Sequence, residues 1–125
     1  MNTAPGPQMI LVAGPYRSGT GDDPAALDAN VRAMTRTALA LFRAGHLGIT
    51  GEALALPLLE EAGSERPGDA VFDEIFHPMA EQLLSRCDAV LRIPGASEGA
   101  DRMVSQARAE GKHVYHSLDD VPAVR

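Results

Sequence analysis

The sequence lacks three features that would each assign it to a familiar class of protein. Only one cysteine, Cys87, is present in 125 residues, which excludes an intramolecular disulfide framework and is typical of a reducing compartment. The eleven lysine and arginine residues are scattered and the net charge is −6, so no broad basic surface for nucleic acid is expected. Residues 1–8 carry no basic segment, and no apolar run approaches the length of a membrane span. We therefore expect a cytoplasmic protein without a nucleic acid or membrane partner.

The composition that remains is that of an ordinary folded protein. Apolar residues make up 45% of the chain and charged residues 22%, which disfavours a disordered or fibrous protein. A chain of 125 residues suits one hydrophobic core and is too short for two. We expect a single domain over residues 1–125, with a flexible start at residues 1–8 and a tail or last half-turn at residues 119–125.

Short apolar runs alternate with helical patterns along the chain. Residues 9–13 form a continuous apolar run, which is typical of a strand buried on both faces. Asp23 and Pro24 then form an N-cap followed by a proline in the first helical turn. Apolar residues recur at steps of three and four up to Gly45, which predicts a helix over residues 24–44.

The rest of the chain continues this alternation. We expect Pro78 to interrupt its helix, because proline has no N–H and clashes with the preceding turn. Strands alternating with helices through short links predict a parallel sheet with helices on both faces, an α/β fold of the doubly wound type. The further strands are expected at residues 46–50, 89–93 and 113–115, and the further helices at residues 52–61, 71–86 and 99–110.

In doubly wound sheets, ligands bind beyond the carboxyl ends of the strands, and the first loop of this kind covers residues 14–22. It offers Arg17, two hydroxyl groups and glycines that allow backbone N–H groups to approach an anion. It matches neither the P-loop nor the dinucleotide-binding fingerprint. The spacing alone leaves two alternatives open: a phosphate- or sugar-binding loop, or a plain flexible turn.

A second strand-end loop covers residues 94–97. It places Ser97 near the N-cap of a helix, whose free N–H groups and dipole favour an anion. Serine is a common cap, so a purely structural role is the favoured interpretation of this residue taken by itself. Because the two loops leave neighbouring strands, we expect Arg17 and Ser97 to bind the same anion.

Histidine, cysteine and acidic residues give weaker signals. The histidines lack the spacing of a metal site, and we expect neither a metal ion nor a cofactor. Cys87 has no base partner visible in the sequence, which favours a buried, unreactive thiol. The acidic group Asp69, Asp73 and Glu74 either approaches a ligand or forms a solvated helix face. The four histidines, expected at the surface or at edges, are His46, His77, His113 and His116.

The first strand with its loop, together with residues 87–90 and 94–100, resembles the nucleoside 2-deoxyribosyltransferase superfamily. Within it the chain is more similar to the small uncharacterised DUF4406-type domains and, more distantly, to the 2′-deoxynucleoside 5′-phosphate N-hydrolases. The resemblance extends over residues 8–114. It implies a flavodoxin-like sheet, a site at the ends of the first and third strands, and a homo-oligomer in which a neighbour completes the pocket.

The resemblance also implies roles for single residues. Arg17 and Ser18 match loop positions that contact ligand. Ser97 matches a serine that holds a 5′-phosphate, which favours a nucleotide or sugar phosphate as the ligand. The catalytic glutamate of the active families, six residues later, corresponds to Met103, and an assisting carboxylate corresponds to Ala80. Since neither side chain can act as a nucleophile or an acid, the parent glycosyl transfer is not expected.

The sequence therefore predicts a nucleotide or sugar-phosphate binding domain, and whether the protein is an enzyme stays open. The alternative is an N-ribosyl or deoxyribosyl hydrolase or transferase that acts on a nucleoside 5′-monophosphate through relocated carboxylates, with Glu98, Asp101 and Asp73 as candidates. A third interpretation is a structural partner domain. The expected ligand-binding residues are Gly14, Pro15, Tyr16, Arg17, Ser18, Gly51, Glu52, Pro94, Gly95, Ser97, Gly99 and Met103.

Overall fold

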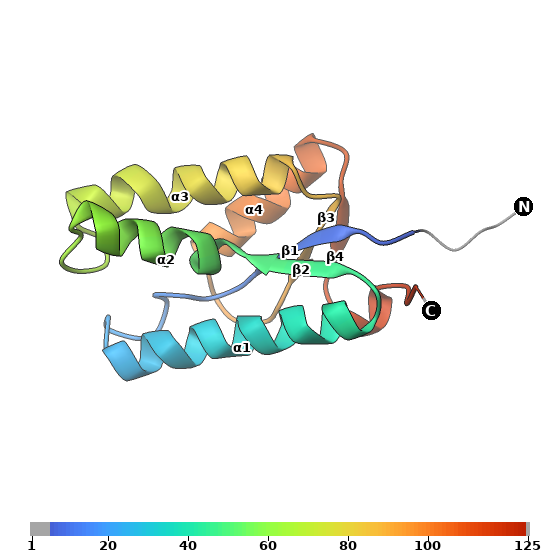
Figure 1. Ribbon diagram of the computed structural model, residues 1–125, viewed down its shortest axis with the longest axis horizontal. Coiled ribbons are helices and arrows are strands. Elements are labelled where there is room, and N and C mark those ends of the chain that lie inside the picture. The colour runs from blue at the N-terminus through green and yellow to red at the C-terminus, as the bar shows by residue number, and fades with distance from the viewer. Residues whose placement is uncertain (1–5, 125) are drawn as a thin grey trace, which may run out of the picture.

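Four parallel strands form the centre of the computed structural model, which describes residues 6–124 (Figure 1). Their order across the sheet is β2-β1-β3-β4, so the two central strands are β1 and β3. This arrangement confirms the expected doubly wound, flavodoxin-like α/β fold. The strands are β1 (Met9–Ala13), β2 (Leu47–Thr50), β3 (Ala89–Arg92) and β4 (His113–Tyr115).

Helices cover both faces of this sheet (Figure 1). One face carries α1 (Pro24–Arg43), and the other carries α3 (Ala70–Ser85) and α4 (Glu98–Ala109). The remaining helix, α2 (Gly51–Ala62), packs alongside α3, and a short 3-10 helix, η1 (Leu118–Asp120), follows β4. In the described part of the chain, no helix is both long and apolar enough to cross a membrane.

The core lies in two layers because side chains alternate between the faces of a strand. Ile10 and Val12 of β1 pack with Met34 and Leu41 of α1 on one face. Leu11 of β1 packs on the other face with a group from β3, α3 and α4. The central strands are thus buried on both faces, as their continuous apolar runs predict.

The expected interruption at Pro78 is wrong, since α3 continues through it. Helix α2 likewise continues through Pro57. Each proline removes one helical hydrogen bond, and each is exposed, so water can reach the carbonyl group that loses its partner. Burial of Phe72, Leu83 and Leu84 on the inner face of α3 offsets the local cost.

The expectation of a surface position is also wrong for His46, which is buried. Its Nδ1 accepts a hydrogen bond of 3.0 Å from the Gln8 N–H, and its Nε2 lies 2.6 Å from the carbonyl oxygen of Pro122. The imidazole ring therefore joins the segment before β1 to the segment after η1. Of the expected flexible start, residues 1–5 lie outside the described residues, as does Arg125 of the tail.

Candidate functional site

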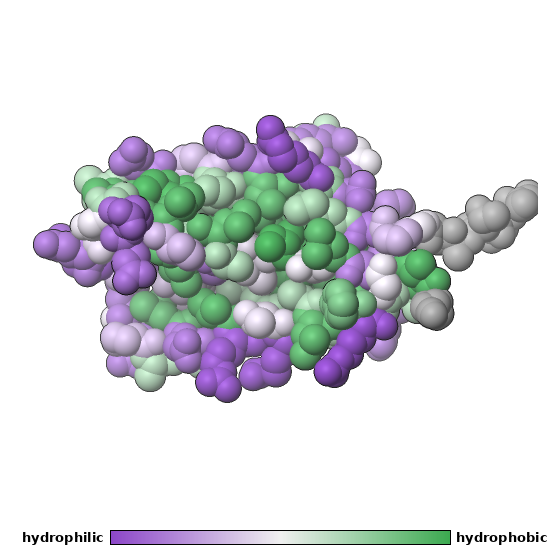
Figure 2. Space-filling view, in the orientation of Figure 1, coloured by the Kyte–Doolittle hydropathy of each residue, from purple (hydrophilic) through white to green (hydrophobic). Residues whose placement is uncertain are grey.

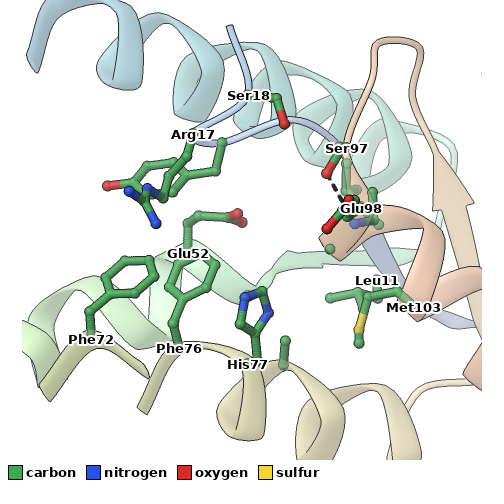
Figure 3. Close-up of a pocket in the computed structure, with 18 residues that line it drawn as sticks. Leu11, Arg17, Ser18, Glu52, Phe72, Phe76, His77, Ser97, Glu98 and Met103 are labelled. Atoms are coloured by element: carbon green, nitrogen blue, oxygen red, sulfur yellow. Dashed lines mark hydrogen bonds between the residues drawn. The ribbon is translucent and has the colours of Figure 1, made fainter. Parts of the chain in front are cut away.

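A cavity of about 360 Å³ opens at the carboxyl ends of β1 and β3. Its walls come from five parts of the fold: the end of β1, the loop between β1 and α1, the first turn of α2, the inner face of α3 and the first turns of α4. Figure 3 shows these side chains converging from opposite directions. The position agrees with the expected site beyond the strand ends, and the volume lies within the range of roughly 300–1,000 Å³ typical of small-molecule sites.

The loop between β1 and α1 has a defined conformation. Asn30 of α1 donates a hydrogen bond of 2.8 Å to the carbonyl oxygen of Tyr16. Thr20 donates one of 2.6 Å to the carbonyl oxygen of Arg17 and accepts one of 3.0 Å from the N–H of Asp22. These bonds tie the loop to itself and to α1 beside the cavity.

Arg17 lies at one side of the cavity and already has an acidic partner. Its guanidinium donates two hydrogen bonds of 2.9 Å to Asp22 and lies 5.5 Å from the ring centroid of Phe72. The hydrogen bond from Arg17 lowers the pKa of Asp22. Figure 3 shows Arg17 and Ser97 on opposite sides of the cavity, so the expectation that both bind one anion is not retained.

Ser97 caps α4 and also lines the cavity. Its Oγ accepts a hydrogen bond of 3.0 Å from the N–H of Ala100. The N–H groups of Glu98 and Gly99, in the first turn, have no partner within the helix. Because the positive end of the helix dipole adds to these donors, this side of the cavity is suited to an anion. The structural and the ligand-binding interpretations of Ser97 are therefore compatible.

Aromatic rings form the opposite wall. The ring centroids of Phe72 and Phe76 are 4.5 Å apart and those of Tyr16 and Phe76 are 5.3 Å apart, both in stacked arrangements. His77 meets Phe76 edge-on at 5.4 Å. Burial, helped by the charge of Arg102, lowers the pKa of His77. The wall offers flat apolar surface to a planar ligand.

The aromatic wall is the part of the site that the sequence did not reveal. His77 was expected at the surface, and Phe72 and Phe76 were not singled out. All three lie on one face of α3, at spacings of four and five residues, together with Ala80. That spacing indicates a shared face of one continuous helix. The expected interruption at Pro78 disfavours that interpretation.

Glu52 is a buried carboxylate that faces the cavity. It lies in the first turn of α2, two residues after Thr50, whose Oγ1 caps the helix by accepting a hydrogen bond of 3.0 Å from the N–H of Ala53. Only 7% of Glu52 is exposed, and burial raises the pKa of its carboxyl group to about 7. Figure 3 shows this side chain between the aromatic wall and the Ser97 side.

Apolar side chains form the base of the cavity at the two positions where the resemblance implies carboxylates. Met103 is 6% exposed, packs in the core with Leu11 and Val104, and also lines the cavity. Ala80 packs against the same core group and lines the cavity as well. The side chain of Met103 thus both fills core and borders the site.

The other expected carboxylates are less favourably placed. Glu98 lines the cavity but is exposed. Asp101 points elsewhere, with its Oδ1 accepting a hydrogen bond of 2.9 Å from Arg92. Asp73 is exposed and does not line the cavity, and its neighbour Asp69 caps α3. Among the expected catalytic candidates, only Glu98 borders the site.

Three expected ligand-binding residues do not line the cavity: Pro15, Pro94 and Gly95. A Cβ atom on Gly95 would lie 2.6 Å from Cγ of Pro15, so the loops after β1 and β3 are in direct contact. Gly95 has φ of 116°, a conformation that glycine adopts readily. Pro94 adjoins this contact and lies outside the cavity. The remaining nine residues, Gly14, Tyr16, Arg17, Ser18, Gly51, Glu52, Ser97, Gly99 and Met103, all line it.

Cys87 is buried, and burial raises the pKa of its thiol to about 11, as expected of an unreactive cysteine. Within residues 6–124, no three His, Cys, Asp or Glu side chains are grouped so as to hold a metal ion. No protein-family model matches the chain, and no curated protein shows significant similarity to it.

Proposed function

We propose that this protein binds a nucleotide or sugar phosphate, and most specifically a nucleoside 5′-monophosphate, as the resemblance to the nucleoside 2-deoxyribosyltransferase superfamily implies. One observation carries the proposal: a single cavity has stacked aromatic rings on one side and the N-terminus of α4 on the other. A planar base packs well against such rings, and a phosphate suits the free N–H groups of a helix N-terminus.

The cavity offers a separate contact for each part of such a ligand. Ser97 and the N–H groups of Glu98 and Gly99 stand where the phosphate is proposed to bind. Met103 offers a thioether surface on which a sugar ring can pack. Phe76 and Tyr16 then face the base. In this arrangement the protein binds its ligand without the nucleophile that glycosyl transfer requires.

A hydrolase or transferase acting on the same ligand is the second candidate. The observation that favours it is the presence of two carboxylates, Glu52 and Glu98, on the cavity wall. A carboxyl group whose pKa lies near neutrality, as that of Glu52 does, is suited to acid–base catalysis. Detection of free base in a reaction with nucleoside 5′-monophosphates separates this candidate from simple binding.

The first experiment is a thermal-shift panel of nucleoside 5′-monophosphates, sugar phosphates and unphosphorylated nucleosides. A specific ligand at about one hundred times its Kd stabilises the folded state by about 2.7 kcal/mol, which is readily seen as a rise in Tm. We expect phosphorylated ligands to raise Tm and nucleosides to act weakly. A panel in which no compound raises Tm contradicts the proposal and favours a structural partner domain.

Ser97→Asp is the matching variant for the phosphate side. Aspartate caps a helix about as well as serine, so α4 is preserved, but its negative charge repels a phosphate. We expect monophosphate affinity to fall while the weaker nucleoside affinity is retained. An equal loss for both ligands indicates damage to the cavity and speaks against a phosphate contact at Ser97.

We also infer that the protein forms a homo-oligomer. Large apolar side chains are exposed on neighbouring elements, among them Phe42 of α1 at 68% and Leu47 of the edge strand β2 at 55%. Figure 2 shows hydrophobic residues spread over α2 and β2, with hydrophilic residues along the rims of the same view. An apolar surface rimmed by polar residues is typical of a protein interface. The other large apolar residues exposed on α1 and α2 are Leu39, Leu54 and Leu58.

A further inference from the structure

His77 is the polar member of the aromatic wall, and the ligand contacts proposed above do not include it. Figure 3 shows its ring projecting from α3 into the cavity, between Phe76 and Met103. Within residues 6–124, neither ring nitrogen takes part in a hydrogen bond, and no side-chain nitrogen is both fully buried and without a partner. The two nitrogens of His77 are therefore accessible to a ligand.

The first turn of α4 contains a space beside His77 that glycine leaves open. A Cβ atom on Gly99 would lie 3.3 Å from Cε1 of His77, 3.9 Å from its Nδ1 and 4.0 Å from Oγ of Ser97. Because Cε1 is bonded to both ring nitrogens, the polar edge of the imidazole faces this turn. The space is bordered by the imidazole, the serine hydroxyl and the free N–H groups of the turn, each of which can donate a hydrogen bond to an anion.

The charge of His77 depends on what occupies this space. Burial, followed by the charge of Arg102, lowers the pKa of His77, so the imidazole is neutral in the free protein at neutral pH. A phosphate in the space reverses this shift, because a negative charge at close range favours the imidazolium. The other charged groups around the ring are Glu81 and Asp73 of α3 and Arg17 of the loop, and Glu52 of α2 and Glu98 of α4 line the same cavity.

We propose that His77 holds the phosphate of the ligand together with the first turn of α4, and that it takes up a proton when the phosphate binds. This assignment rests on the proposed function, since it requires a phosphorylated ligand. His77 is then a specificity-determining residue. As an imidazolium it donates a charge-assisted hydrogen bond to a phosphate oxygen, and an unphosphorylated nucleoside gains nothing from it. The proton comes from the solvent, and no covalent bond of the ligand changes.

The test is calorimetric titration with the common nucleoside 5′-monophosphates, in ribose and deoxyribose form, and with the matching nucleosides. Titrations in PIPES and in Tris give the number of protons taken up, because the two buffers differ in their heat of ionisation. We expect proton uptake with monophosphates and none with nucleosides. Since the proton is bound more tightly in the complex, monophosphate affinity should fall as pH rises from about 6.5 to 8, by at most about tenfold per unit. Monophosphate binding without proton uptake overturns the proposal.

His77→Gln separates the imidazole from Glu52 and the phosphate itself, which can also take up a proton. Glutamine still donates a hydrogen bond but does not titrate. Proton uptake should disappear, and monophosphate affinity should fall roughly tenfold while nucleoside affinity is kept, because a charge-assisted contact becomes a neutral one. His113→Gln makes the same change at an exposed position of β4 and should keep the uptake. Uptake that persists in His77→Gln overturns the role of His77 and leaves the proposed function standing. Absence of binding by every monophosphate overturns both.

Gly99→Ala tests the space without altering His77. Alanine is the better helix former, so Tm of the free protein should be maintained or raised. Its methyl group occupies the space beside the imidazole, so monophosphate affinity should fall severalfold while nucleoside affinity is kept. Unchanged monophosphate affinity in this variant means that the phosphate binds elsewhere and contradicts the proposal.

Discussion

Arg17 and Asp22 form a pair of parallel hydrogen bonds, both of 2.9 Å, across the loop that borders the cavity. The loop conformation permits this because Asp22 adopts φ of 60°, which turns the chain back toward Arg17. Both side chains are more than a third exposed, so the pair contributes little to the stability of the fold. Its main effect is to fix the direction of the guanidinium, which lies over Phe72.

The first prediction concerns this pair. Arg17→Ala should weaken binding of a nucleoside monophosphate roughly tenfold, because the guanidinium lies over Phe72 on the side of the cavity where the base is proposed to bind, and its contact with the base is lost. Asp22→Asn should strengthen binding, since it frees the guanidinium and removes a negative charge. Asparagine also tolerates the positive φ at this position. Isothermal titration of the two variants measures both affinities. A change of affinity in the same direction for both variants refutes a ligand contact by Arg17.

The second prediction is a pH dependence of stability that arises from Glu52. Its pKa is about 7 in the folded state and 4.5 as the ordinary value, so the unfolded chain loses this proton first as pH rises. Stability is therefore lost between about pH 4.5 and pH 7 and stays reduced above that interval. Glu52→Gln removes this cost and should stabilise the protein at pH 8 by about 2 to 3 kcal/mol, with little effect near pH 4.

Urea denaturation of the natural protein and of Glu52→Gln at both pH values measures the difference. Glu60→Gln serves as the control, because its side chain is exposed on the same helix. An equal gain at pH 4 and pH 8 indicates a packing effect of the amide and contradicts the titration of Glu52 as its source.

The third prediction is that the natural protein releases no base from 2′-deoxynucleosides or their 5′-monophosphates. Met103 and Ala80 line the cavity where the resemblance implies two carboxylates, and neither can attack an anomeric carbon or assist a leaving base. The double variant Met103→Glu, Ala80→Asp restores both groups and should gain measurable base release. Chromatographic detection of free base compares the two proteins. Robust turnover by the natural protein refutes this prediction and directs attention to Glu52 and Glu98.

The fourth prediction concerns self-association. Phe42 is 68% exposed, so Phe42→Ser leaves the core intact and removes apolar area from the surface that α1, β2 and α2 share. We expect light scattering to show an oligomer for the natural protein and a shift toward monomer for the variant. An unfolding midpoint measured at low protein concentration checks that the monomer is undamaged. A natural protein that is monomeric from micromolar to millimolar concentration contradicts the inference.

The fold was predictable where local pattern and tertiary environment agree. The run Met9–Ala13 is apolar throughout because β1 is covered on both faces, and Asp23 caps α1 by accepting a hydrogen bond of 3.1 Å from the N–H of Ala26. The position of His46 was not predictable, since its partners lie 38 and 76 residues away in the sequence. The continuity of α3 through Pro78 was not predictable for a related reason, since the packing of α3 outweighs the local cost of proline.

The site was predictable as a location and less so as a chemical environment. Ser97 and Arg17 stand out in the sequence because they follow strand ends. The burial of Glu52 depends on how closely α3 packs against α2, which a single sequence does not encode in any local pattern. The aromatic wall requires α3 to be continuous through Pro78, whereas the proline by itself predicts a broken helix. Composition and spacing thus predict where the cavity lies, but they do not predict its buried carboxylate or its aromatic wall.

The position of His46, which links the segment before β1 to the segment after η1, has a practical consequence for handling the protein. Gln8 and Pro122 are held at the same ring, and Figure 1 shows the first and last described segments of the chain at the same edge of the molecule. That edge is opposite the carboxyl ends of the strands, where the cavity opens. An affinity tag or a biotin anchor at either terminus therefore leaves the cavity free, and protein immobilised on a sensor surface presents it to solution.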